Sequence, residues 1–221
     1  MLVKEKDSMN KFFSGVYLWM FIGLLVSGAV AYFVSSTPSL FKMVYSTYYL
    51  FVILELIVVI AFSALLRKVS PTVAKILFIV YSIVNGLTLS SIFIVYKLGS
   101  IVMVFISSAV LFGLLALYGY FTKQNLTSFG KLLFIGLIAV IIMSIINMFV
   151  LSSSFGIILS VVSVVLFLGL TAYDMQMLKS MYNYYSSEEL QKASIYGALN
   201  LYLDFINIFL HLLSLFGKSR D

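Results

Sequence analysis

Seven long apolar runs, separated by short polar connections, are the feature that most constrains the fold of this chain. The runs cover residues 16–34, 48–66, 73–96, 101–120, 132–151, 156–178 and 195–216. Each is close to the ~20 residues that a helix needs to cross the hydrocarbon core of a bilayer. In lipid every backbone N–H and C=O must be paired within the protein, and a helix pairs its own. The pattern predicts an all-α membrane protein, a bundle of seven transmembrane helices forming a single domain over residues 1–221.

The overall composition excludes whole classes of function. Hydrophobic residues make up 62% of the chain and charged residues only 10%, whereas soluble domains average about 45–50% and about 25%. A soluble enzyme and a nucleic-acid-binding module are therefore excluded, and the lipid bilayer is the expected partner. The chain has no Cys and one His, which argues against a zinc centre with the usual nitrogen and sulfur ligands. We expect no cofactor.

The positive charges predict the orientation of the chain in the membrane. With the N-terminus in the cytoplasm, ten Lys and Arg fall on that side and four on the other. The ten are Lys4, Lys6, Lys11, Arg67, Lys68, Lys75, Lys123, Lys131, Lys179 and Lys192, and the four are Lys42, Lys97, Lys218 and Arg220. Because cytoplasmic loops carry the excess of positive charge, we expect a cytoplasmic N-terminus and a C-terminus outside. The longest connection is expected at residues 179–194.

Three carboxylates lie inside predicted spans. They are Glu55, Asp174 and Asp204, in the second, sixth and seventh runs. A charged carboxylate in hydrocarbon costs about 3 kcal/mol on insertion scales, so such groups are usually paired, protonated or facing water. They mark a functional site, or they hydrogen-bond to neighbours as structural groups. For Asn85, an interhelical hydrogen bond is the default interpretation.

The last run carries the strongest polar pattern. Its polar residues are spaced four, three and four apart and therefore share one face of a helix; they are Asn200, Asp204, Asn207 and His211. Since the intervening residues are nearly all apolar, this face must meet protein or water, and we expect the helix in the centre of the bundle. In the first helix, small residues at every fourth position (Gly23, Ser27 and Ala31) favour close packing.

The two aspartates suggest a pH-sensitive site. Asp204 is expected near mid-membrane and Asp174 near the cytoplasmic end of the sixth helix, and they meet if the seventh helix tilts or begins deeper. Two carboxylates in one site do not both ionise cheaply, and they also offer the oxygen ligands that Ca²⁺ prefers. Arg67 is either a membrane-edge anchor or a latch to an acidic partner. His211 is either a proton acceptor or a group bonded within the bundle.

Known catalytic signatures are missing. Tyr173-Asp174 resembles half of the intramembrane aspartyl protease signature, but the Gly-x-Gly-Asp half has no counterpart around Asp204. The sequence also contains no P-loop, EF-hand or Gly-x-Ser-x-Gly pattern. We therefore expect no enzymatic activity.

Three stretches of the chain form recognisable motifs: Gly86-Leu87-Thr88-Leu89-Ser90-Ser91-Ile92-Phe93, Tyr173-Asp174-Met175-Gln176-Met177-Leu178-Lys179 and Ala198-Leu199-Asn200-Leu201-Tyr202-Leu203-Asp204-Phe205-Ile206-Asn207-Ile208-Phe209. Together they resemble the Bax inhibitor motif family, most closely its bacterial members. The resemblance covers nearly the whole chain. It implies a seven-helix bundle with the last helix central, and a pH-sensitive Ca²⁺ leak.

The resemblance also implies roles for individual residues. Asp174 and Asp204 match the family's pH-sensing pair, and Glu55 matches its second-helix glutamate. The arginine that holds the pore shut corresponds to Arg67 or its neighbour. Asn200, Asn207 and His211 are expected to line the ion pathway with Glu55, and the three carboxylates are the candidate Ca²⁺ ligands.

Two other functions remain open at this point. One is a regulatory scaffold that binds other membrane proteins and conducts little, and the other is a proton-coupled transporter that uses the same carboxylates. Few Arg, many Lys, Ile and Tyr, and the bacterial resemblance predict a bacterial plasma membrane as the location.

Overall fold

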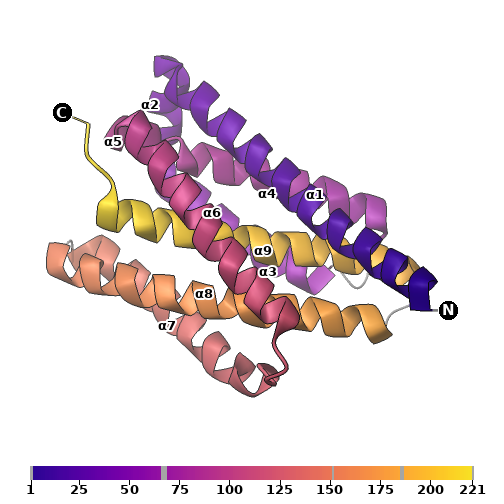
Figure 1. The fold of residues 1–221 in the computed structure, drawn as a ribbon. Coiled ribbons are helices and arrows are strands. Elements are labelled where there is room, and N and C mark those ends of the chain that lie inside the picture. Colours follow the sequence, from indigo (N-terminus) through magenta and orange to yellow (C-terminus); the bar gives the residue numbers. More distant parts are fainter. Residues whose placement is uncertain (1, 66–68, 151, 185–186, 221) are drawn as a thin grey trace. The chain divides into compact units, whose positions relative to one another are not determined.

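The computed structural model describes residues 2–65, 69–150, 152–184 and 187–220, which are helical almost throughout (Figure 1). The helices are α1 (Leu2–Ser35), α2 (Pro38–Ser46), α3 (Tyr48–Leu65), α4 (Pro71–Leu89), α5 (Ile92–Val95), α6 (Leu98–Phe121), α7 (Thr127–Val150), α8 (Ser153–Tyr184) and α9 (Ser187–Phe216). Within the described ranges, six helical stretches are long and apolar enough to cross a membrane. The number rises to seven if a bent pair of helices is counted as one more span. The all-α membrane class is confirmed, and the predicted seven spans agree when the bent pair counts as one.

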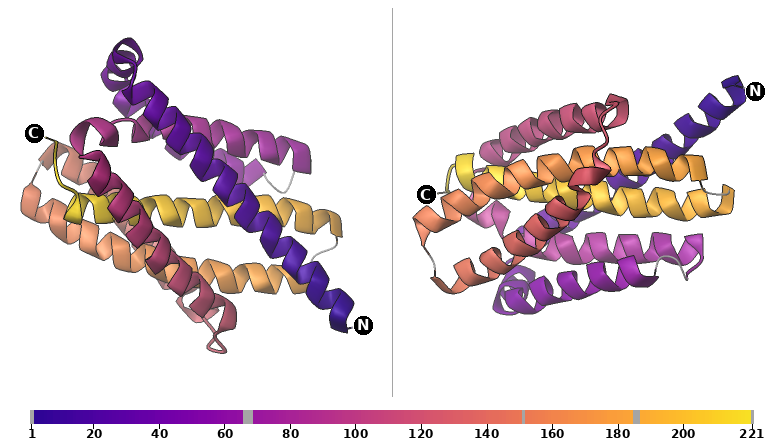
Figure 2. Two further views of the ribbon diagram at one scale, coloured as in Figure 1. Left: turned by 45° about the horizontal axis from the view of Figure 1, so that its top comes forward. Right: turned by 90° about the horizontal axis from the view of Figure 1, so that it is seen from below.

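The bent pair consists of α2 and α3, which meet at an angle of 71° (Figure 2). The predicted second span matches α3, whereas α2 is an additional helix that the apolar runs do not indicate. Thr47 lies at the break, and its hydroxyl donates to the carbonyl of Met43 at 2.9 Å. Such back-bonding by a Thr side chain competes with the helical ladder and often accompanies a bend.

The predicted third span is interrupted between α4 and α5. The hydroxyl of Ser90 donates to Leu87 O at 2.6 Å, and that of Ser91 donates to Thr88 O at 2.9 Å. The backbone N–H groups of both serines also bond three residues back, which tightens the chain into a turn. The stretch still counts as one candidate span, Pro71–Val95.

Several helices extend well beyond their apolar runs. α1 begins at Leu2 rather than near residue 16, and α8 continues to Tyr184. Since α9 begins at Ser187, the long connection expected over residues 179–194 is wrong, and most of it is helix. Apolar runs report the part of a helix that lies in lipid, whereas polar residues continue the same helix into the interface.

The chain divides into two compact units. The first contains residues up to Tyr96, Met181–Tyr202 and the chain end at Arg220, and the second contains Lys97–Ser180 and Leu203–Ser219. The single-domain assignment stays a prediction. In the first unit α1 packs closely on α4. The approach is so close that a Cβ on Gly86 would lie 2.8 Å from Ser27 O. This confirms the close packing predicted from the small residues of the first helix.

Candidate functional site: a carboxyl pair and a buried polar chain

The structure brings Asp174 on α8 and Asp204 on α9 together in the second unit. Both side chains are buried, with 8% and 4% of their surfaces exposed, and they are near enough for their charges to interact. Asp204 lies near the middle of the candidate span Glu189–Phe216. Asp174 lies within the candidate span Ser153–Tyr184, four residues before the predicted end of its apolar run at residue 178. The two carboxyls therefore meet inside the membrane-spanning part of the chain.

The hydrogen bonds of Asp204 are incomplete within the described residues. Thr171 on α8 bonds to one carboxyl oxygen, while Oδ2 is buried with no partner among these residues. The Thr171 hydroxyl also lies 2.8 Å from Phe167 O, so its single proton serves one acceptor at a time. One proton, one metal cation or one cationic side chain would relieve the repulsion between the two carboxylates.

Close contact between α6 and α8 positions Asp174. A Cβ on Gly119 would lie 2.8 Å from the backbone C and Cα of Ala172, so only glycine permits this approach. Two residues after Asp174, Gln176 accepts the N–H of Leu126 and donates to Gln124 O, both at 2.8 Å. The segment Tyr173–Lys179 is thus held against the connection between α6 and α7. The sequence analysis did not identify this role of Gln176.

The third intramembrane carboxylate, Glu55 on α3, belongs to the first unit. Its Oε1 accepts hydrogen bonds from Thr88 Oγ1 at 2.6 Å and from Asn85 Nδ2 at 3.2 Å, both on α4. Glu55 is half-buried. The charge is therefore solvated by two polar groups of the neighbouring helix.

The polar contacts of Glu55 continue across the first unit. Tyr202 on α9 donates to Asn85 Oδ1 at 2.7 Å, and Ser27 Oγ on α1 lies 2.5 Å from Tyr202 Oη. Ser27 Oγ also lies 2.8 Å from Ser82 O. We call Ser27, Glu55, Asn85, Thr88 and Tyr202 the buried polar chain. The interhelical hydrogen bond predicted for Asn85 is confirmed, whereas the participation of Ser27, Thr88 and Tyr202 in this chain was not predicted.

The polar face predicted on the last helix is present, because α9 is continuous over all four residues. Asn200 is half-buried, and Asn207 Nδ2 donates to Leu203 O of its own helix at 2.8 Å. His211 Nδ1 lies 3.4 Å from Ser160 Oγ, and its ring stacks on Phe167 with 6.4 Å between centroids. His211 is thus bonded within the second unit, and its role as a proton acceptor stays a prediction.

The remaining predicted site residues are not assembled into a metal site. Among the described residues, no three His, Asp or Glu side chains form a group that could hold a metal ion. Glu55 belongs to one unit, and Asp174 and Asp204 belong to the other. The role of these three as Ca²⁺ ligands stays a prediction. Arg67, the predicted latch, lies outside the described residues.

Comparisons with known proteins cover nearly the whole chain. The sequence model of the family described as "Inhibitor of apoptosis-promoting Bax1" matches residues 9–221. The inner membrane protein YbhL of Escherichia coli is 40% identical over 225 residues, which cover 99% of this chain and 96% of that protein. An uncharacterized protein of Borreliella burgdorferi is also 40% identical, over 100% of this chain and 98% of its own length. An uncharacterized membrane protein of Streptococcus pyogenes is 36% identical over 96% of this chain and 94% of its own.

Proposed function

The chain belongs to the Bax inhibitor-1 family of membrane proteins, and from this premise we propose that it is a pH-sensitive calcium leak of the bacterial inner membrane. Protonation of the Asp174–Asp204 pair gates the pathway. Glu55, Asn200, Asn207 and His211 line it, and Ca²⁺ and protons are the ions that it handles. The N-terminus faces the cytoplasm, and the C-terminus lies outside.

The observation that carries this proposal is the burial of two interacting carboxyls inside two candidate spans. Ionisable groups in such positions are rare in membrane proteins, and they commonly belong to ion pathways or proton relays. A structural hydrogen-bonding role is less well supported for Asp204, because its Oδ2 lacks a partner among the described residues.

The pair supplies a simple gating chemistry. With both carboxyls ionised, the site attracts a cation or a cationic side chain, and the proposed latch Arg67 is one such group. When the pair takes up a proton, this attraction weakens and the cationic group is released. Carboxylate oxygens are also the ligands that Ca²⁺ prefers, so the same residues can pass the ion once the latch opens.

The test is Ca²⁺ entry into dye-loaded proteoliposomes containing the purified protein, measured from about pH 6 to about pH 8, where a coupled carboxyl pair can titrate. Wild type is compared with Asp174→Asn and Asp204→Asn, which keep the side-chain shape and remove the charge. The matched control is Glu189→Gln, because Glu189 is an exposed carboxylate at the start of the same α9. We expect the Ca²⁺ flux through wild type and through the control to depend on pH. Both Asn variants should lose this pH dependence.

Other outcomes would favour the alternatives. If the flux did not exceed that of empty liposomes at any pH, the calcium-leak proposal would be contradicted and the regulatory scaffold favoured. A flux that saturates and shows substrate counterflow would favour the proton-coupled transporter. A pH dependence that persists in Asp204→Asn would remove the carboxyl pair as the sensor. Arg67→Gln adds a separate test of the latch, for which constitutive flux is the expected result.

A further inference from the structure

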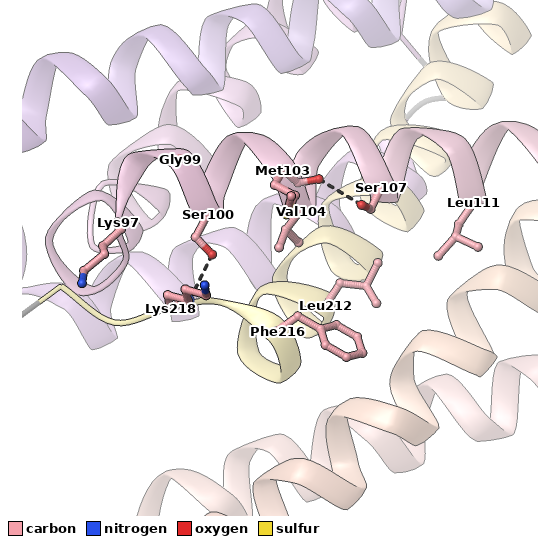
Figure 3. Close-up of a pocket in the computed structure, with 10 residues that line it drawn as sticks. All are labelled: Lys97, Gly99, Ser100, Met103, Val104, Ser107, Leu111, Leu212, Phe216 and Lys218. Atoms are coloured by element: carbon pink, nitrogen blue, oxygen red, sulfur yellow. Dashed lines mark hydrogen bonds between the residues drawn. The ribbon is translucent and has the colours of Figure 1, made fainter.

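A pocket of about 620 Å³ lies in the second unit, between the N-terminal half of α6 and the end of α9 (Figure 3). α6 contributes one wall, and the last turn of α9 with the residues after it contributes the other. The lining residues are Lys97, Gly99, Ser100, Met103, Val104, Ser107, Leu111, Leu212, Phe216 and Lys218. None of these described residues is acidic, and two of them are lysines.

The polar and apolar residues of this pocket are separated. Figure 3 shows Lys97, Ser100 and Lys218 at one end and Leu111 at the other, with Phe216 and Leu212 of α9 between them. The two lysines are tied together through the backbone, because Lys97 N–H donates to Lys218 O at 3.0 Å. Lys218 N–H in turn donates to Ser100 Oγ at 2.9 Å. Both lysines are exposed.

The position of the pocket relative to the spans matches one leaflet of a bilayer. Lys97 directly precedes the candidate span Leu98–Phe121, and Lys218 lies two residues after the end of Glu189–Phe216. Both ammonium groups therefore fall at the membrane interface, where Lys side chains usually lie. From Lys97 to Leu111 the helix rises about 21 Å. This is close to half of the ~40–45 Å thickness of a bilayer with its headgroups.

We propose that this pocket binds an anionic phospholipid of the phosphatidylglycerol class. The phosphate lies at Lys97 and Lys218, and an acyl chain follows Met103, Leu111 and Phe216 toward mid-membrane. The pocket has two lysines at one end and an apolar wall about as long as one leaflet is thick. This combination favours a lipid over a free phosphate or a second copy of the chain. A free phosphate would not use the apolar wall, and a second copy of the chain would not need the paired charges. Basic pockets between transmembrane helices are known to bind anionic headgroups.

The test is native mass spectrometry of the purified protein in a nonionic detergent, titrated with phosphatidylglycerol and, separately, with phosphatidylcholine. We expect phosphatidylglycerol to bind about tenfold more tightly, and the double variant Lys97→Gln/Lys218→Gln to lose most of that preference. The matched control is Lys42→Gln/Lys131→Gln, which removes two exposed lysines from other elements and should bind like wild type. Circular dichroism and the melting temperature establish that each variant is folded.

Competition experiments distinguish a lipid phosphate from a free phosphate. Inorganic phosphate and glycerol phosphate at millimolar concentration should fail to displace the lipid, because neither has an acyl chain. Displacement by either one would identify a free-phosphate site and overturn the proposal. Equal binding of the two lipids, or full retention of phosphatidylglycerol by the Lys97/Lys218 variant, would also overturn it. The proposal would also be overturned if wild type formed a dimer without lipid and the Lys97/Lys218 variant did not. The pocket would then be a contact with a second copy of the chain.

Discussion

Tyr202 Oη lies 2.7 Å from Asn85 Oδ1, and the Nδ2 of the same amide lies 3.2 Å from Glu55 Oε1. These two contacts fix the orientation of the Asn85 amide. Its NH₂ must face the carboxylate, which only accepts, and its oxygen faces the tyrosine hydroxyl, which donates. In the first unit, α3, α4 and the part of α9 up to Tyr202 are thereby joined through one side chain. The Asn85 amide that donates to Glu55 is thus itself fixed by its bond to Tyr202.

Replacing Tyr202 by Phe tests how much this linkage stabilises the protein. Tyr202 is fully buried, so the substitution leaves Asn85 Oδ1 without its donor while the ring keeps its edge contacts with Phe78 and Tyr81. We expect a loss of about 1–2 kcal/mol in the free energy of unfolding, the usual cost of an unsatisfied buried acceptor. Denaturant unfolding in mixed micelles measures it.

The matched control for Tyr202→Phe is Tyr32→Phe. Tyr32 is 60% exposed, and its ring contact with Phe93 survives the change. The control should alter the free energy of unfolding by less than about 0.5 kcal/mol. Equal effects of the two substitutions would show that the buried polar chain adds nothing to stability.

Glu55→Gln separates the charge of Glu55 from its hydrogen bonds. The Gln Oε1 can still accept from Thr88 Oγ1 and Asn85 Nδ2, so the melting temperature should stay near that of wild type. If Glu55 lines the pathway, loss of one carboxylate charge should reduce Ca²⁺ entry about tenfold, equivalent to about 1.4 kcal/mol. The flux assay in proteoliposomes measures this, with Glu189→Gln as the control. Unchanged flux in Glu55→Gln would exclude Glu55 from the pathway.

The positions of the spans were predictable from the sequence, because lipid demands continuous apolar helices of a fixed length. The breaks in the helices were not, since they depend on local hydroxyl bonds such as those of Thr47 and Ser90. Nor did apolarity reveal where α8 ends and where α9 begins, because both helices continue into polar sequence. Composition thus locates spans more reliably than helix ends.

The carboxylates of the candidate site were also predictable, because charged groups stand out in apolar runs. Their partners were not. Tyr202 and Ser27 are 175 residues apart, and nothing local distinguishes them from other Tyr and Ser residues. Which hydroxyl reaches which amide is decided by the packing of helices. The tight approach of α6 to α8 at Gly119 is hidden for the same reason, since Gly113 on the same helix looks alike in sequence.

Gly119→Ala tests the close approach that positions Asp174. The new methyl group would lie 2.8 Å from the backbone C and Cα of Ala172 and closer still to its carbonyl oxygen, and backbone atoms do not move aside as a flexible side chain would. We expect a loss of about 1–3 kcal/mol in the free energy of unfolding, as for overpacked cores. On Gly113 a Cβ would meet nothing within 4 Å, so Gly113→Ala should be neutral or stabilising by up to about 1 kcal/mol. Similar losses in both variants would contradict close packing at Gly119.

A double-mutant cycle tests the repulsion between Asp174 and Asp204 without relying on transport. Asp174→Asn and Asp204→Asn each remove the same repulsion, so their effects on the free energy of unfolding should not add. The double variant should be less stable than the sum of the single effects predicts, by about 0.5–3 kcal/mol. The coupling should shrink when the pH is lowered far enough to protonate the pair in wild type.

The control cycle for this measurement combines Asp204→Asn with Glu189→Gln on the same helix. The two positions are separated by about 22 Å along α9, so their effects should add within about 0.5 kcal/mol. A coupling between Asp174 and Asp204 no larger than that of the control would mean that their charges do not interact in the folded protein. The proposed sensor would then lose its physical basis, because a pair that shares a proton requires each carboxyl to feel the charge of the other.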